Sequence, residues 1–292
     1  MGAVVIKEVP AKSQKEYGSV REGDTIRQFI LNESVSDGLN FKVFRSQFQP
    51  GASAHQTPRH HHAFQQVRWA ESGSVNYAPG FDIPEGDVCY FPRGAYYGPQ
   101  LKDQGITVTL QLGFGQEQHG AKSNQVREAA TERLMKVGRF ENGLYFDTDP
   151  ETGKERVRDS VHAIYESEAE YSKGEKFEVP PEGYETPILI HTQAFEFFEV
   201  AYGVEVKYLG NFYDHSGPNA DTALSIIRLS DGGVYTFEAD RTQVAWVKNA
   251  GLIIDGKTYP ELTAFYSPRG ETMEISSKDP IEVRVTTMPR LD

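Results

Sequence analysis

The sequence has a single cysteine, Cys89, only two tryptophans, and no long apolar run. One cysteine excludes an intramolecular disulfide framework and a cysteine-rich zinc site. No segment approaches the roughly 20 apolar residues that a membrane-spanning helix needs, and residues 1–13 contain no apolar signal segment. We therefore expect a soluble, cytoplasmic protein whose stability comes from packing.

Basic residues are also scarce. The chain has 30 Lys and Arg against 42 Asp and Glu, a formal net charge of −12, and no basic run. Nucleic acids and acidic membranes bind concentrated Lys and Arg, so we expect neither as a partner. With 292 residues, 38% of them hydrophobic, the chain is long enough for two folded domains and is not disordered in composition.

The 27 glycines and 16 prolines are spread along the chain and predict many turns between short segments. Apolar and polar residues alternate with a period of two in four segments, 41–44, 106–110, 234–237 and 281–285. This pattern is typical of half-buried strands. The sequence therefore predicts a β-rich fold.

A connecting region with helices is predicted between the strand-rich parts, at about 122–180. The spacing of apolar residues predicts one helix over 123–137 and a second over 161–171. A Pro- and Gly-containing turn at 149–153 predicts a hairpin between them.

Two blocks of the sequence repeat. Residues 89–94 (CYFPRG) are matched by residues 265–270 (FYSPRG), and Gly73 has a counterpart in Gly251 at nearly the same spacing. Two blocks repeated at one spacing predict two copies of one β domain.

The densest chemistry lies in residues 58–69. If this segment is a strand, His60, His62, Phe64 and Gln66 share one face. Two imidazoles at positions i and i+2 can converge on one cation, and neutral imidazole suits Fe, Mn, Ni, Cu and Zn. The alternative is a surface histidine cluster that binds no metal.

Together these segments resemble the paired motifs of the cupin superfamily. His60 and His62 match the HxH of its first motif, and Gln66 stands where the family has glutamate. In the second motif, residues 92–94 match PxG and Tyr97 stands where the family has its last histidine. The resemblance implies an all-β fold of two antiparallel jelly-roll barrels with a short helical connecting region, a bicupin.

The resemblance also places the domains. We expect an N-terminal barrel with the site at 1–121, the connecting region at 122–180, and a degenerate C-terminal barrel at 181–292. In the C-terminal copy, Glu238 and Asp240 replace the two histidines and would share a strand face. Two carboxylates without further donors are typical of a solvated edge, so we interpret this barrel as structural.

A metal site is implied by the same resemblance. It would hold one divalent first-row transition metal, iron in the first place, with Mn, Ni, Cu or Zn as alternatives. The ligands would be His60, His62, Gln66 and Tyr97, although a neutral amide and a phenol are weaker ligands than carboxylate and imidazole. Gln66 and Tyr97 are also catalytic candidates, Gln66 to orient substrate and Tyr97 as a ligand or as general acid–base.

Other residues extend this candidate site. His55 or His119 could supply a third imidazole. Phe64, Arg68 and Tyr96 are candidates for the substrate pocket, and Arg68 could bind a substrate carboxylate or pair with an acidic side chain.

Three functions are consistent with this sequence. The first, which the resemblance to bicupin dioxygenases implies, is a metal-dependent oxygenase acting on a small-molecule substrate. The second is an isomerase or lyase that uses His and Tyr for proton transfer. The third is a non-catalytic small-molecule binding protein with a decayed metal site. The resemblance also implies a homodimer.

Overall fold

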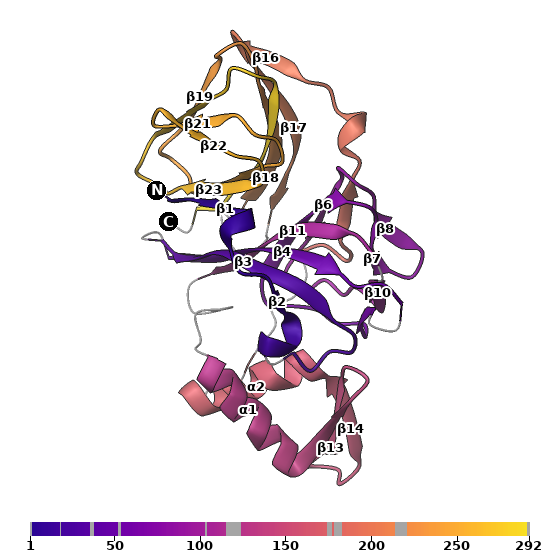
Figure 1. Cartoon of the computed structure of the whole chain (residues 1–292). Coiled ribbons are helices and arrows are strands. Elements are labelled where there is room, and N and C mark those ends of the chain that lie inside the picture. The colour runs from indigo at the N-terminus through magenta and orange to yellow at the C-terminus, as the bar shows by residue number, and fades with distance from the viewer. Residues whose placement is uncertain are drawn as a thin grey trace. The chain divides into compact units, whose positions relative to one another are not determined.

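A computed structural model describes residues 2–17, 19–35, 38–51, 54–102, 104–114, 124–173, 177, 183–213 and 221–290. Antiparallel strands dominate it (Figure 1), and two α-helices come between two groups of strands in the order of the chain. The predicted all-β fold with a short helical connecting region is confirmed. All four predicted strand segments lie in strands.

The first group of strands has these bounds: β1 (Gly2–Val5), β2 (Lys12–Ser13), β3 (Thr25–Ser34), β4 (Leu39–Phe48), β5 (His55–Thr57), β6 (Gln65–Ser72), β7 (Val75–Ala78), β8 (Phe81–Ile83), β9 (Val88–Phe91), β10 (Gln100–Lys102) and β11 (Ile106–Phe114). The connecting region contains α1 (Asn124–Val137), β12 (Gly138–Glu141), β13 (Leu144–Thr148), β14 (Glu155–Asp159) and α2 (Ser160–Lys173).

The second group has these bounds: β15 (Ile188–Ile190), β16 (Phe198–Ala201), β17 (Val204–Tyr213), β18 (Asp221–Leu229), β19 (Val234–Phe237), β20 (Gln243–Val247), β21 (Leu252–Ile254), β22 (Lys257–Tyr259), β23 (Thr263–Ser267), β24 (Met273–Ser276) and β25 (Ile281–Thr287). Short 3-10 turns lie at Ile6–Glu8, Gln14–Tyr17 and Thr192–Ala194.

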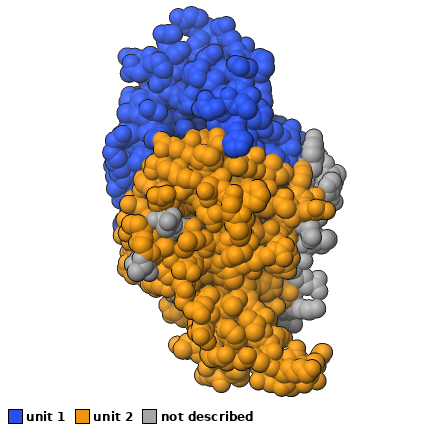
Figure 2. Space-filling model, turned by 90° about the vertical axis from the view of Figure 1, so that its right-hand side faces the viewer, with its two compact units in different colours: residues 1–10, 29–40, 190–292 blue, residues 11–28, 41–189 orange. Residues whose placement is uncertain are grey.

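Contacts within the chain divide it into two compact units (Figure 2). One contains residues 11–28 and 41–189, and the other contains residues 1–10, 29–40 and 190–292. This grouping differs from a simple division along the chain because β1 pairs with β23, which places the first residues with the C-terminal strands. The predicted boundaries after residues 121 and 180 stay a prediction.

A seven-stranded sheet with the order β15-β9-β6-β11-β4-β3-β2 forms the frame of the N-terminal barrel. On one face, Ala70, Cys89 and Phe91 pack in a buried cluster with side chains of the β7–β8 hairpin. Gln66 and Arg68 pair with Phe91 and Cys89, and directly paired residues point to the same side of a sheet. We call this side of the sheet the inner face.

The connecting region forms a small helical layer on a three-stranded sheet, β12-β13-β14. Ala130 and Leu134 of α1 pack with Tyr145 of β13 in a buried cluster, and the Tyr145 hydroxyl donates to the Leu134 carbonyl (2.8 Å). Asp159 caps α2, because its Oδ1 accepts from two backbone amides of the first turn (3.0 and 2.9 Å). The predicted hairpin and both predicted helices are confirmed within one to two residues at their described ends.

The C-terminal unit closes around an apolar core. Its sheets have the orders β1-β23-β20-β25-β18-β17-β16 and β19-β24-β21-β22. Met273, which follows Gly270 by three residues as Tyr97 follows Gly94, is 1% exposed inside this core. The prediction that Glu238 and Asp240 share a strand face is wrong: β19 ends at Phe237, and both carboxylates lie in an exposed turn.

No α-helix in the described part of the chain is long and apolar enough to span a membrane.

Candidate functional site

The HxH segment lies in the connection between two strands, so the condition under which His60, His62, Phe64 and Gln66 would share one strand face is not met. β5 ends at Thr57 and β6 begins at Gln65. An isolated bridge holds the segment to the second motif: His60 N donates to Tyr97 O (2.9 Å), and Tyr97 N donates to His60 O (3.0 Å). Pro58 has no backbone N–H, so it interrupts the strand hydrogen bonding just before the three histidines. The bridge between His60 and Tyr97 is the pairing that the segment keeps.

The two motifs meet at a cluster of rings. The ring centroids of His60 and Tyr97 are 4.3 Å apart, those of His60 and His62 are 5.0 Å apart, and those of His62 and Tyr97 are 5.7 Å apart. Phe64 stacks on His62 with its centroid at 4.3 Å. Four of the predicted site residues are therefore neighbours in space.

His60 has a fixed tautomer. Its Nδ1 lies 2.7 Å from the carbonyl oxygen of Pro58. Because a carbonyl oxygen can only accept, Nδ1 carries the proton and donates, which leaves Nε2 with a lone pair. His60 can therefore act as a base or as a ligand through Nε2.

Gln66 joins this cluster from the start of β6. Its Oε1 accepts a hydrogen bond from Gln111 Nε2 (3.1 Å), and Gln111 is its partner on β11. Gln66 Nε2 is buried and has no hydrogen-bond partner among the described residues. No sequence motif singled out Gln111, although its pairing with Gln66 places it beside the motif. In this arrangement Gln66 offers the site a donor rather than a ligand oxygen.

Tyr97 is a buried phenol beside a guanidinium. Burial raises the pKa of Tyr97 to about 12, while the charge of Arg68 lowers it. Tyr97 is therefore protonated at neutral pH and is a hydrogen-bond donor rather than a tyrosinate. The nearby positive charge reduces the cost of negative charge that forms next to the hydroxyl.

Arg68 lies on the inner face and is 5% exposed. Its guanidinium carbon lies 4.6 Å from the ring centroid of Phe91. Burial lowers the pKa of Arg68, and the groups that oppose this shift are Tyr97 and Cys89, which are neutral at pH 7. Two alternatives were predicted for Arg68, namely binding a substrate carboxylate and pairing with an acidic side chain. No ion pair of Arg68 with an acidic side chain is found among the described residues.

Two further candidates lie elsewhere. Tyr96 is 41% exposed, and its ring stacks on His61 with the ring centroids 4.1 Å apart. Neighbouring residues of an extended segment point to opposite sides, so Tyr96 points away from the side of Tyr97. The structure therefore does not bring Tyr96 together with Tyr97. His55 is buried, and its Nδ1 is bound by Gln14 Nε2 (2.7 Å). His119 lies outside the described residues.

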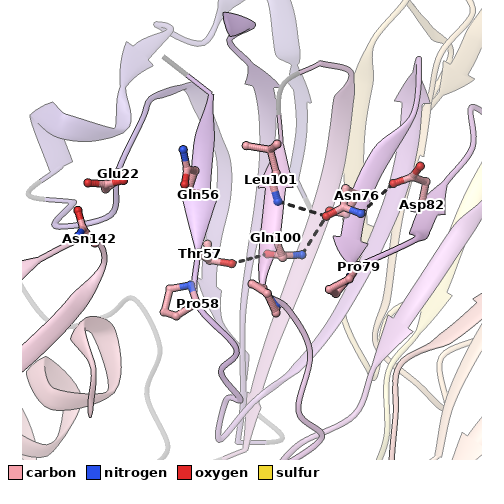
Figure 3. A pocket seen from close by; sticks show the side chains of 11 residues that line it. Glu22, Gln56, Thr57, Pro58, Asn76, Pro79, Asp82, Gln100, Leu101 and Asn142 are labelled. Atoms are coloured by element: carbon pink, nitrogen blue, oxygen red, sulfur yellow. Dashed lines mark hydrogen bonds between the residues drawn. The ribbon is translucent and has the colours of Figure 1, made fainter. Parts of the chain in front are cut away.

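A separate groove of about 780 Å³ lies beside the β5–β10 pair (Figure 3). Its polar side chains bind one another: the Thr57 hydroxyl donates to Gln100 Oε1 (3.1 Å), and the Asn76 amide donates to the Asp82 carboxylate (3.0 Å). None of the predicted site residues lines it. Its lining residues are Glu22, Gln56, Thr57, Pro58, Asn76, Pro79, Asp82, Pro99, Gln100, Leu101 and Asn142.

The donor set does not fit a resident divalent metal. Of the four predicted ligands, the two imidazoles are suitable, the Gln66 oxygen is occupied by Gln111, and Tyr97 keeps its proton. No group of three or more His, Cys, Asp and Glu is placed to hold a metal within the described ranges. A divalent cation here would meet four neutral candidate ligands, none of them a carboxylate, and the positive charge of Arg68.

Gly98 controls the position of the His60 acceptor. It has φ of +90°, and a Cβ at this position would lie 2.7 Å from the Pro58 carbonyl oxygen. Gly98→Ala should therefore lower the free energy of unfolding by about 1 to 3 kcal/mol and displace the His60 ring. Urea unfolding and the histidine NMR signals measure both effects. Gly80→Ala, a positive-φ glycine with open space around it, is the control for the backbone strain alone.

Known structures resemble the whole chain. Over 99% of this chain, a proposed dioxygenase of Nostoc punctiforme aligns with a TM-score of 0.59 at 9% identity, covering 83% of that chain. Oxalate decarboxylase of Bacillus subtilis gives 0.56 at 12% identity, covering 99% of this chain and 76% of the other. Quercetin 2,3-dioxygenase of Acinetobacter baumannii gives 0.50 at 12% identity, covering 100% and 87%.

No protein-family model matches the sequence, and a search of curated proteins gives no significant match. At 9 to 12% identity the structural likenesses show the fold. The chain has the two-barrel fold of the bicupins, as its paired motifs predicted.

Proposed function

We propose that the N-terminal barrel is the active site of a small-molecule enzyme and that its reaction is proton transfer, of the isomerase or lyase kind. The observation that carries this proposal is the bond from His60 Nδ1 to the Pro58 carbonyl, which fixes a basic Nε2 beside the neutral phenol of Tyr97. A base and a proton donor held in one cluster are the parts that such a reaction needs.

His60 acts as the general base. A proton leaves a carbon of the substrate for Nε2, and the Pro58 carbonyl stabilises the imidazolium that forms. Tyr97 donates a hydrogen bond to the substrate oxygen on which negative charge develops, and Arg68 stabilises that charge through its position beside Tyr97. The buried aromatic rings of Phe64 and Phe91 exclude water from the reacting atoms.

The second candidate is the metal-dependent oxygenase. The HxH pair and the likeness of the fold to dioxygenases favour it. A bound iron or manganese would supply Lewis-acid or redox chemistry. The neutral donor set and the adjacent Arg68 count against it, so no step of the proposed reaction depends on a metal.

Hydrogen–deuterium exchange into small molecules tests the proposal without knowledge of the full reaction. The intact protein is incubated in D2O with a panel of 2-oxo and 3-oxo compounds, both neutral and carboxylated, and the loss of C–H signals is followed by NMR. We expect exchange faster than in buffer for at least one compound. Exchange that is equal to the buffer rate for all of them would favour the binding-protein alternative.

A further inference from the structure

Basic side chains of β3 and β4 also point to the inner face. On the opposite face, Arg45 donates to Glu71 Oε2 (2.6 Å) and to Gln28 Oε1 (3.3 Å). Because side chains alternate along a strand, Arg27 and the even-numbered residues of β4 point the other way. The guanidinium carbon of Arg27 lies 5.3 Å from the Phe44 ring centroid, which agrees with this placement.

Four cations from four different elements act on one another there. Burial and the charges of Arg68 and Arg127 lower the pKa of Arg27 to about 10. Burial and the charges of Arg27 and Arg127 lower the pKa of Lys42 to about 8. Arg127 belongs to α1 and also interacts with Tyr165 of α2. In a chain with a net charge of −12, this is a local concentration of positive charge.

Gln66 and Arg68 both interact with the Tyr97 hydroxyl. Even so, three nearly buried polar atoms on this face, Gln66 Nε2, Arg68 Nη1 and Ser46 Oγ, have no acceptor in good hydrogen-bond geometry among the described residues. Their side chains are 3%, 5% and 2% exposed. Each of these atoms can donate a hydrogen bond. A buried donor without an acceptor costs free energy, so three on one face indicate an acceptor that binds there.

The protein itself does not supply this acceptor in the part that the structure describes. The inner-face positions of β4, β6, β9 and β11 include no Asp or Glu. On β3, Glu33 is on the same side as Arg27 and accepts a hydrogen bond from the Tyr266 hydroxyl (3.5 Å). Asp24, the carboxylate whose charge acts on Arg27, already accepts hydrogen bonds from Ser13 Oγ and the Thr25 amide (both 2.8 Å). Arg27, Arg68 and Arg127 form no ion pair within the described residues.

We propose that the inner face of the N-terminal barrel binds a small organic carboxylate, with Arg68, Gln66 and Ser46 as donors and Arg27 and Lys42 providing positive charge. A guanidinium with an amide beside it suits the two oxygens of a carboxylate. This inference rests on the proposed function for the site's location and deepens it by naming the substrate class.

The aromatic residues of this face favour an organic anion over inorganic phosphate. Phe44 and Phe91 lie next to Arg27 and Arg68 and offer apolar surface to the body of the ligand. Phosphate has no apolar body to place there, so it would leave this surface without a partner.

Calorimetric titration of the intact protein tests the proposal. The probes are acetate, succinate, benzoate and phenylacetate, each compared with its neutral amide, together with inorganic phosphate. We expect at least one carboxylate to bind at least 10-fold more tightly than its amide. Binding of phosphate but of no carboxylate, equal binding of acid and amide, or no binding below 10 mM would each overturn the proposal.

Matched variants locate the binding. Arg68→Met keeps the apolar stem and should weaken carboxylate binding at least 10-fold, because it removes a charged hydrogen-bond donor. Arg45→Met, on the opposite face of the same sheet, should leave binding within 2-fold. Ser46→Ala removes one unpartnered hydroxyl and should weaken binding about 3-fold, which keeps the test decisive if Arg68→Met fails to fold. Unchanged affinity in a folded Arg68→Met would overturn the assignment.

The two proposals fail in different ways. His60→Ala should slow exchange by about 100- to 10,000-fold and leave carboxylate binding within 2-fold, since His60 acts on the substrate carbon. If carboxylates bind and no exchange occurs, the ligand class stands and the proton-transfer function is wrong. If neutral compounds exchange as fast as carboxylates, the function stands and the ligand class is wrong.

Discussion

Replacing His60 by alanine should slow the enzyme-catalysed exchange by about 100- to 10,000-fold, the effect typical of removing a general base. The reason is geometric: the Pro58 carbonyl fixes the proton on Nδ1 and leaves Nε2 as the basic atom beside Tyr97. Exchange rates in D2O, measured by NMR at several pH values, provide the measurement.

The neighbouring histidine provides the control. His61 points away from the cluster, where its Nδ1 lies 3.2 Å from the Gly94 carbonyl and its ring stacks on Tyr96. His61→Ala should therefore keep the exchange rate within 3-fold. If the two variants lose activity equally, His60 is not the base and the assignment fails. Tyr97→Phe should lose about 100-fold, since it removes a donor to the developing negative charge.

Replacing Lys42 by methionine should stabilise the fold by about 2 to 3 kcal/mol at pH 7. The pKa of Lys42 is lowered from 10.5 to about 8 by burial and by Arg27 and Arg127. A cation that is disfavoured by the folded state destabilises it, and methionine fills the same space without the charge. Chemical unfolding of the two proteins at pH 7 measures the difference.

The pH dependence of this difference follows from linkage. Between about pH 8 and 10.5 the unfolded chain binds a proton at Lys42 that the folded chain has released, so wild-type stability gains with pH in this window. The advantage of Lys42→Met should therefore shrink as pH rises through the window. Lys154→Met, at an exposed turn, serves as the control and should change stability by less than 0.5 kcal/mol. A constant advantage across the window would contradict the account.

The same substitution should weaken carboxylate binding, because it removes one of the inner-face charges. Greater stability together with lower affinity is the usual relation for a residue that is retained for binding. Thus the protein tolerates a cluster of like charges that costs stability, and a bound anion would relieve that cost.

Local sequence patterns predicted much of the fold and part of the site. Strand alternation and turn residues depend on neighbours in the chain, so the four strand segments, both helices and the hairpin were predicted. The resemblance to the paired motifs also placed His60 and Tyr97 in one site, and a backbone bridge joins these two residues; their roles stay a prediction. The condition that the HxH segment is a strand is not met, because Pro58 and the bridge end the ladder there.

The remaining features depend on contacts between distant segments. Alternation along the strands predicts which residues share a side with Arg27 on β3 and with Lys42 on β4. It does not show that Arg68 is on that same side. This follows only from the sheet order, in which β11 joins β4 and β3 to β6. Tyr96 and Tyr97 are adjacent residues of the same type, so the sequence alone does not show which of them lies in the site. The backbone bridge to His60 shows that it is Tyr97. The orientation of the Gln66 amide depends on Gln111, which lies 45 residues further along the chain.

The most direct test of the account is the exchange reaction of metal-depleted protein. Protein purified without a histidine tag is treated with a chelator, checked by elemental analysis, and compared with samples given Fe, Mn, Ni, Cu or Zn. We expect exchange into a small carboxylate to persist without metal and to fall at least about 100-fold in His60→Ala. If exchange appears only when one of these metals is added, and the metal binds stoichiometrically and is lost in His60→Ala/His62→Ala, the protein is a metal-dependent enzyme and the proposed proton-transfer mechanism is wrong.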